Sequence, residues 1–224
     1  MHGRPFDNPR DMNHHWIIAK QGFPFIVPLG ILAVAFAVFG KIGVSIPFFL
    51  LTIFVIWFFR NPERRPPLDV NVIVSPADGK VIRIEDVLEN DLINGPSKKI
   101  SIFMNVFNVH VNRIPYSGTV EAIRYREGKF FSANLDKASA LNEKNSVLIK
   151  TESDKKILTE QIAGLIARRI ECWVTKGMCV NKGDRFGLIR FGSRLDVFLP
   201  ADADISVSVG DKVRAGETPI GWLQ

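Results

Sequence analysis

Two long runs without a charged residue, close to the N-terminus, place the strongest constraint on this chain. Residues 23–39 and residues 42–59 contain no Asp, Glu, Lys or Arg, and only Gly40 and Lys41 separate them. Each run is near the lower limit for a helix that crosses about 30 Å of hydrocarbon. Basic residues flank the pair on both outer sides, which predicts a helical hairpin with both ends in the cytoplasm. We therefore expect an N-terminal tail over residues 1–21 and a membrane-associated helical hairpin over residues 22–60.

Two other interpretations of these runs stay open. A buried hairpin in a soluble protein is one, although two adjacent charge-free runs are rare in a core of this size. A shallow hairpin that enters only one leaflet is the other, and the short runs and their prolines favour it. Residues 61–69, which are rich in Pro and Arg, then read as a linker whose arginines lie beside anionic headgroups.

The remaining residues, 70–224, have the pattern of a single mainly β domain. Short β-branched runs alternate with turn residues about every ten positions, which is typical of β-sandwiches and barrel-like folds. Residues 157–173 have no clean period, and we interpret them as strand because their surroundings are rich in strands. A short helical turn is expected near residues 135–142. The other expected strands are residues 70–74, 80–84, 99–104, 118–126, 147–150, 186–191, 195–199 and 205–209.

Several classes of function are disfavoured by composition and spacing. The net charge of +6 permits nucleic-acid binding, but no basic stripe interleaved with aromatic residues is present, so no nucleic acid is expected as a partner. No glycine-rich phosphate loop or dinucleotide fingerprint occurs. Cys172 and Cys179 lack the His or Cys neighbours of a zinc site, so we expect no metal and two small, buried, reduced cysteines.

Few residues of this domain offer acid–base chemistry. His110 is its only histidine, and on pattern alone a single histidine is more often structural. If residues 109–113 form a strand, His110 and Asn112 lie on the same face. Gly192-Ser193, near the C-terminus, is by itself a common turn dipeptide.

In its sequence context, however, this dipeptide resembles the processing site of the phosphatidylserine decarboxylase proenzymes. Phe191-Gly-Ser193 is followed by Arg-Leu-Asp-Val and Leu-Pro. Residues 75–81 resemble the Asp-Gly block of that family, and residues 107–115 resemble its His block. Asn142-Glu143 is similar to an Asn-Glu-Arg stretch, with Lys144 in place of Arg. The resemblance covers about residues 61–224 in the order of the family, and the chain is similar to its compact prokaryotic branch.

The resemblance implies a carboxy-lyase made as a zymogen. The chain would cut itself between Gly192 and Ser193, and Ser193 would become a pyruvoyl group, with no metal. The small fragment 193–224 would stay bound to the large fragment 1–192, and a homo-oligomer stays open. The pyruvoyl group would form a Schiff base with phosphatidyl-L-serine, a membrane phospholipid, and release of CO₂ would give phosphatidylethanolamine. This step of phospholipid biosynthesis would take place on the cytoplasmic side of the cell membrane.

The resemblance also suggests roles for single residues. Ser193 would be the nucleophile, His110 the base, and Asp78 the group that orients His110, unless Asp78 is only a turn residue. Better-known members have a second histidine where this chain has Arg113, so either His110 serves both cleavage and decarboxylation or Arg113 and a neighbour take part. Candidate substrate-binding residues are Arg113, Arg194, Asn142 and Glu143. Arg194 and Lys80 could hold the lipid phosphate or lie on the solvated surface.

Two rival functions remain. Residues 200–219 resemble a lipoyl- or biotinyl-type hammerhead, so a hammerhead-related, membrane-anchored binding module without enzymatic activity is one. This chain lacks the Met-Lys-Met sequence of a lipoyl or biotinyl carrier, and a binding module would not need to be cut at Gly-Ser. An archaetidylserine decarboxylase, which acts on an ether-linked lipid with the same head group, is the other.

Overall fold

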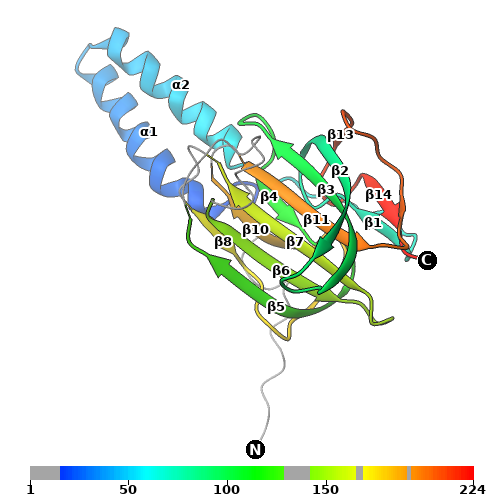
Figure 1. The fold of residues 1–224 in the computed structure, drawn as a ribbon. Helices are drawn as coiled ribbons and strands as arrows, with labels where there is room; N and C mark the ends of the chain where they lie inside the picture. The colour runs from blue at the N-terminus through cyan, green and yellow to red at the C-terminus, as the bar shows by residue number, and fades with distance from the viewer. Residues whose placement is uncertain (1–15, 129–141, 165–168, 191–192) are drawn as a thin grey trace, which may run out of the picture. The chain divides into compact units, whose positions relative to one another are not determined.

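A computed structural model describes residues 16–128, 142–164, 169–190 and 193–224 (Figure 1). The chain divides into two compact units, Met1–Glu63 and Arg64–Gln224. Their boundary falls within the segment expected to be a linker. Most of the helical turn expected near residues 135–142, and the dipeptide Phe191-Gly192, lie outside the described residues.

The first unit contains the two helices predicted from the charge-free runs. After a 3-10 turn, Lys20–Gly22, α1 spans Phe23–Val38 and α2 spans Ile42–Phe58. The chain reverses between them at Gly40, whose φ of 69° suits glycine. The helices contact each other through stacked rings of Phe36 and Phe48, 5.6 Å apart, and through a 2.7 Å hydrogen bond from Ser45 Oγ to the Ala33 carbonyl. Helix Lys20–Val38 is long and apolar enough to cross a membrane, and α2 is a shorter apolar helix.

The two ends of this helical pair are joined by the chain that precedes α1. The Ala19 N–H donates to the Phe59 carbonyl at 2.8 Å, and Asn61 donates from its backbone N–H to Ile17 at 2.7 Å. Two exposed tryptophans lie near the start of α1 and the end of α2, and a cation lies over the ring of each. Lys20 lies 5.5 Å from the ring of Trp16, and Arg60 lies 4.2 Å from the ring of Trp57.

The second unit is built of strands, as the sequence predicts. Its largest sheet has the order β13-β2-β3-β11-β7-β6-β5-β9, and two three-stranded sheets have the orders β4-β10-β8 and β1-β14-β12 (Figure 1). Neighbouring strands in these three sheets pair antiparallel. The strands are β1 Val72–Val74, β2 Gly79–Glu89, β3 Gly95–Met104, β4 Val111–Arg113, β5 Gly118–Arg126, β6 Lys144–Lys150, β7 Lys156–Ala163, β8 Ile170–Cys172, β9 Cys179–Val180, β10 Arg185–Ile189, β11 Ser193–Pro200, β12 Asp204–Ile205, β13 Lys212–Val213 and β14 Pro219–Trp222.

Strand β11 lies in the middle of the large sheet, between β3 and β7. Its alternate residues Leu195, Val197 and Leu199 face the main core, which the three sheets enclose together. Since side chains alternate along a strand, Ser193 points to this same core face. The core also takes Ile73 and Ile220 from the sheet of β1 and β14, and Phe186 and Ile189 from β10.

Two expectations about strands and cysteines are wrong in part. The alternating residues 205–209 were expected to form one strand, but β12 ends at Ile205. The reason is a turn: the Ser208 N–H donates to the Asp211 carboxylate, and the Gly210 N–H donates to the Val81 carbonyl, both at 2.8 Å. Both cysteines are free, but Cys179 is exposed rather than buried, since β9 is at the end of the large sheet.

Candidate active site

Ser193 begins β11 and lies inside the protein. It is in register with Met104 of β3 on one side and with Ala163 of β7 on the other. Its side chain is fully buried, and among the described residues its hydroxyl has no hydrogen-bond partner. Leaving a buried hydroxyl unpaired costs about 1–3 kcal/mol, so such groups call for an explanation other than packing. Gly192, the other residue of the expected cut, lies outside the described residues.

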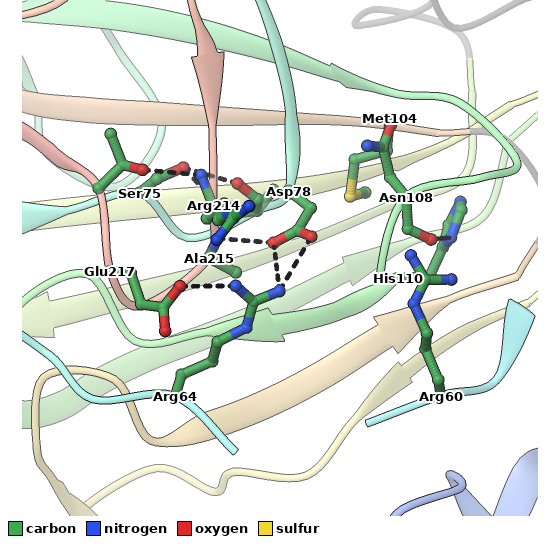
Figure 2. A network of polar contacts seen from close by, with 12 residues as sticks. Arg60, Arg64, Ser75, Asp78, Met104, Asn108, His110, Arg214, Ala215 and Glu217 are labelled. Carbon is green, nitrogen blue, oxygen red and sulfur yellow. Dashed lines mark hydrogen bonds and ion pairs between the residues drawn. The ribbon is translucent and has the colours of Figure 1, made fainter. Parts of the chain in front are cut away.

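His110 is also fully buried, directly before β4. The Ile189 N–H of β10 donates to its carbonyl at 3.4 Å, which continues the pairing of β4 with β10. In the side chain, Nδ1 lies 3.0 Å from the Asn108 carbonyl oxygen (Figure 2). Because a carbonyl oxygen can only accept, Nδ1 carries the proton of the neutral ring and Nε2 is its basic nitrogen. This arrangement suits a general base that acts through Nε2.

Asp78 lies in the turn that leads into β2, and its carboxylate has two partners among the described residues. Oδ1 accepts a hydrogen bond from the Ala215 N–H at 2.8 Å, and Oδ2 lies 3.2 Å from Arg64 Nη2. Arg64 also reaches Glu217 at 2.6 Å, so one cation joins two carboxylates (Figure 2). We expected Asp78 to orient His110. The structure instead pairs its oxygens with Arg64 and Ala215, so a catalytic role for Asp78 stays a prediction.

Arg64 lies in a different environment from the one that the sequence predicts. We expected it beside lipid headgroups, but its side chain is only 11% exposed and lies in these ion pairs. Its partners are 14 and 153 positions away in sequence, so no local pattern could identify the cluster.

Two candidate substrate-binding arginines are held by internal partners. Arg113 donates from Nη1 to the Gly183 carbonyl at 2.7 Å. Arg194 Nε lies 2.8 Å from Asp196 Oδ1, and both side chains are almost fully buried. A solvated surface position for Arg194 is therefore wrong, whereas Lys80 of β2 is exposed. Binding of substrate by Arg113 or Arg194 stays a prediction.

Asn142 and Glu143, the other candidates for substrate binding, anchor the backbone on either side of residues 164–169. Asn142 Nδ2 donates to the Ala163 carbonyl at 2.7 Å. Glu143 Oε1 accepts from the Tyr125 hydroxyl at 2.8 Å and from the Ile170 N–H at 3.2 Å. Burial and the hydrogen bond to Glu143 raise the pKa of Tyr125 to about 12. Both residues thus stabilise the surroundings of Ala163, which is in register with Ser193, and their contact with substrate stays a prediction.

A chain of buried amides that ends at Met104, the residue in register with Ser193, is a further feature that the sequence did not reveal. Asn145 Nδ2 donates to Gln161 Oε1 at 2.9 Å, and Gln161 Nε2 donates to Asn112 Oδ1 at 2.8 Å. Asn112 Nδ2 in turn lies 3.6 Å from the sulfur of Met104. These three amides are nearly inaccessible to solvent and come from β6, β7 and β4. The alternation of residues 109–113 indicated only that Asn112 shares a face with His110.

The next question is whether acidic, histidine or cysteine side chains of the described residues could bind a metal ion. Across the described ranges, no group of three or more His, Cys, Asp or Glu side chains is placed to hold a metal ion. Cys172 is partly buried, and burial raises the pKa of its thiol, while interactions with Val174 and Asn145 act in the opposite direction. The buried polar candidates near the start of β11 and β4 are therefore Ser193, His110 and three uncharged amides, and their union in one active site stays a prediction.

Comparison with known proteins gives consistent results. A family model described as phosphatidylserine decarboxylase matches residues 51–221. A phosphatidylserine decarboxylase proenzyme of Syntrophus aciditrophicus is 55% identical over 213 residues, covering 94% of this chain and 99% of the relative. The proenzyme of Desulfotalea psychrophila is 50% identical, with 92% and 96% covered, and that of Magnetococcus marinus is 44% identical, with 95% and 98% covered.

Proposed function

This chain belongs to the phosphatidylserine decarboxylase family, and we propose on that premise that it cuts itself between Gly192 and Ser193 and then decarboxylates phosphatidylserine. The observation that carries the proposal is the Ser193 hydroxyl, which is fully buried and has no hydrogen-bond partner among the described residues. Such a group fits a residue that is consumed by chemistry better than one kept for packing.

The residues around Ser193 fit conversion of this serine to a pyruvoyl group. Ser193 becomes the first residue of the small fragment, and β3 and β7 hold that end of β11 on both sides. Met104 and Ala163 carry no charge and would leave a carbonyl at Ser193 chemically undisturbed. Bound in this place, a pyruvoyl group supplies a carbonyl that accepts the electrons released when CO₂ leaves the lipid head group.

His110 is the residue that moves protons in this proposal. Its Nδ1 is fixed by the Asn108 carbonyl, so Nε2 removes the proton from the Ser193 hydroxyl during self-cleavage. The same nitrogen later returns a proton to the substrate carbon. Arg113 is an unsuitable alternative for either transfer, because a guanidinium does not give up its proton and this one is held by the Gly183 carbonyl. We therefore assign both steps to His110.

After the cut, the two fragments would stay together through the sheets. In the small fragment, β11 pairs with β3 and β7, β13 pairs with β2, and β14 pairs with β1. The hydrogen bond from Ala215 to Asp78 and the ion pair of Glu217 with Arg64 also join the fragments. These contacts support a complex of residues 1–192 with residues 193–224.

The helical pair would hold the enzyme at its lipid substrate. Most apolar side chains of α1 and α2 are exposed within their unit, as expected for helices that contact lipid. Trp16 and Trp57, each with a cation over its ring, have the composition of a membrane interface. We propose association with the cell membrane, with the catalytic unit on the cytoplasmic side.

Intact mass spectrometry and a lipid assay test this function together. The purified chain should separate under denaturing conditions into fragments that end at Gly192 and begin at Ser193. Presented with phosphatidylserine in mixed micelles, it should release CO₂ and form phosphatidylethanolamine. The Ser193→Ala variant should stay one chain and be inactive. An intact wild-type chain, or a cleaved chain without decarboxylation of the lipid, would refute the proposal.

A further inference from the structure

Asn112 presents a hydrogen-bond donor deep in the protein, beside Met104, the residue in register with Ser193. Its side chain is fully buried, and the partner of Nδ2 among the described residues is the sulfur of Met104, 3.6 Å away. A thioether is a weak acceptor. A buried amide N–H usually has a much better one. The donor is thus available for an oxygen that forms during the reaction.

The register of the large sheet places this donor close to Ser193. Met104 lies directly opposite Ser193, and Cβ atoms of such pairs are about 4.5–5.5 Å apart. On the other side, Asn112 reaches Gln161, which is two residues before Ala163 and on the same face. The amide of Asn112 therefore bridges the two strands that flank β11, on the face to which Ser193 points.

The orientation of the Asn112 amide is set by its neighbours. Gln161 accepts from Asn145 through Oε1, so its Nε2 must donate to Asn112 Oδ1. This contact turns Asn112 Nδ2 toward Met104, which is in register with Ser193. Gly187 leaves the necessary space, because a Cβ there would lie 2.8 Å from Gln161 Nε2.

We propose that Asn112 stabilises the oxyanion of the self-cleavage reaction, with Gln161 and Asn145 as positioning residues; the inference rests on the proposed function. Ser193 Oγ adds to the Gly192 carbonyl carbon, and its proton passes to the base. The carbonyl oxygen takes the negative charge and accepts the N–H of Asn112. The C–N bond then breaks, the Ser193 nitrogen takes up the proton, and an ester between Gly192 and Ser193 remains.

The Asn112→Asp variant tests this directly, because it keeps the shape of the side chain and the acceptor for Gln161 but replaces the donor with an oxygen. Near neutral pH, self-cleavage followed by intact mass should slow roughly 10²–10³-fold, as for loss of one oxyanion donor. The slowing should grow as pH rises, because a protonated carboxyl can still donate whereas an ionised one repels the oxyanion. Unfolding midpoints of Asn112→Asp in a Ser193→Ala background over the same pH range separate this effect from a loss of structure on ionisation of the buried carboxyl.

Hydroxylamine at neutral pH identifies the step that is slowed, since it cuts the ester between Gly192 and Ser193; cleavage of the Asn94-Gly95 peptide bond needs alkaline hydroxylamine and gives fragments of different mass. The uncut Asn112→Asp chain should resist hydroxylamine, because the block precedes the ester. A variant that accumulates a hydroxylamine-sensitive chain, or that cuts at the wild-type rate across the pH range, would overturn the proposal.

Two further variants separate chemistry from folding. Asn112→Leu, which lacks both donor and acceptor, should be slow at every pH. Thr159→Val is the matched control, because Thr159 is fully buried on β7, two residues from Gln161, and its hydroxyl bonds the Val147 carbonyl at 3.3 Å. It should lose a buried hydrogen bond and still cut at the wild-type rate.

If Asn112→Leu does not fold, the result for Asn112→Asp decides whether Asn112 has this role, since that variant preserves the contact with Gln161. A wild-type chain that fails to cut refutes the proposed function, whereas variants that cut like the wild type refute only the role of Asn112.

Discussion

The carboxylate of Asp78 accepts a 2.8 Å hydrogen bond from the backbone of Ala215, and the proposed cut lies between these two residues in the chain. The ion pair of Arg64 with Glu217, at 2.6 Å, also joins residues on opposite sides of the proposed cut. If the chain is cut before Ser193, one end of each contact lies in the large fragment and the other in the small fragment. We therefore expect this cluster to hold the two fragments together, whatever the role of Asp78 in catalysis.

Removing Asp78 should weaken the fold. Asp78→Ala leaves Arg64 with one carboxylate partner and leaves the Ala215 N–H without an acceptor. We expect a loss of about 3 kcal/mol in the free energy of unfolding, typical for breaking a buried ion pair. Denaturant unfolding of Asp78→Ala, compared in a Ser193→Ala background, measures this loss without interference from cleavage.

The matched control for this variant is Asp154→Asn. Asp154 forms an exposed ion pair with Lys150 at 2.8 Å, and Asn tolerates its φ of 61°. Its midpoint of unfolding should stay that of the parent. Equal midpoints for Asp78→Ala and the parent would show that the Arg64 cluster does not stabilise the unit.

His110 should be required for self-cleavage. In His110→Gln the ring nitrogens are lost while a polar side chain of similar length remains. Loss of a general base typically slows a reaction 10²–10⁴-fold, so we expect mostly intact chain when the wild type is fully cut. A gel under denaturing conditions follows the conversion with time. Normal cleavage and normal release of CO₂ by this variant would remove His110 from the mechanism.

Tyr125 should make stability depend on alkaline pH. Its pKa is raised from 10 to about 12 in the folded protein, first by partial desolvation of a side chain that is still 53% exposed and then by Glu143. A raised folded-state pKa gives stability that is complete below pH 10 and is lost as pH rises toward 12. Tyr125→Phe should lose less stability than the wild type between pH 10 and 12. The difference between their unfolding midpoints at pH 9 and pH 11.5 measures the effect, and a difference that does not change with pH would contradict it.

Membrane association should depend on the apolar surface of α1. Ile31 and Val34 are 63% and 64% exposed within their unit. Each lysine placed at the centre of a membrane helix costs about 3 kcal/mol, so Ile31→Lys combined with Val34→Lys should shift the protein from the membrane fraction to the soluble fraction. Leu88→Lys, at an exposed apolar residue of β2, is the control and should stay with the wild type. Retention of the double variant in the membrane fraction would count against α1 as the anchor.

Most helices and strands of this protein could be predicted because each follows from the pattern of residues within its own segment. The charge-free runs became α1 and α2, and alternating residues between turns became β2, β5 and β11. Residues 157–163 gave no period because they form β7, which is buried on both faces in the middle of the sheet. Residues 205–209 alternate, but side-chain contacts of Asp211 favour a turn there.

The site was predictable only as far as single residues carry chemistry. Ser193 and His110 were identified from motifs, and the structure buries both. The order of strands around β11 depends on pairing between distant segments, so the contact of Asn112 with Gln161, 49 positions away, had no signal in the sequence. The same reason explains why Arg64 was expected at the membrane rather than beside Asp78.

The mass of the small fragment is the most direct test of the central claim, that Ser193 is converted to a pyruvoyl group. The account predicts a fragment 193–224 that is lighter by one ammonia than hydrolysis of the bond before Ser193 would give. It should also gain mass with a carbonyl-reactive hydrazine and resist sequencing from its N-terminus. A fragment that begins with an ordinary serine, or a chain that remains uncut, would contradict the account.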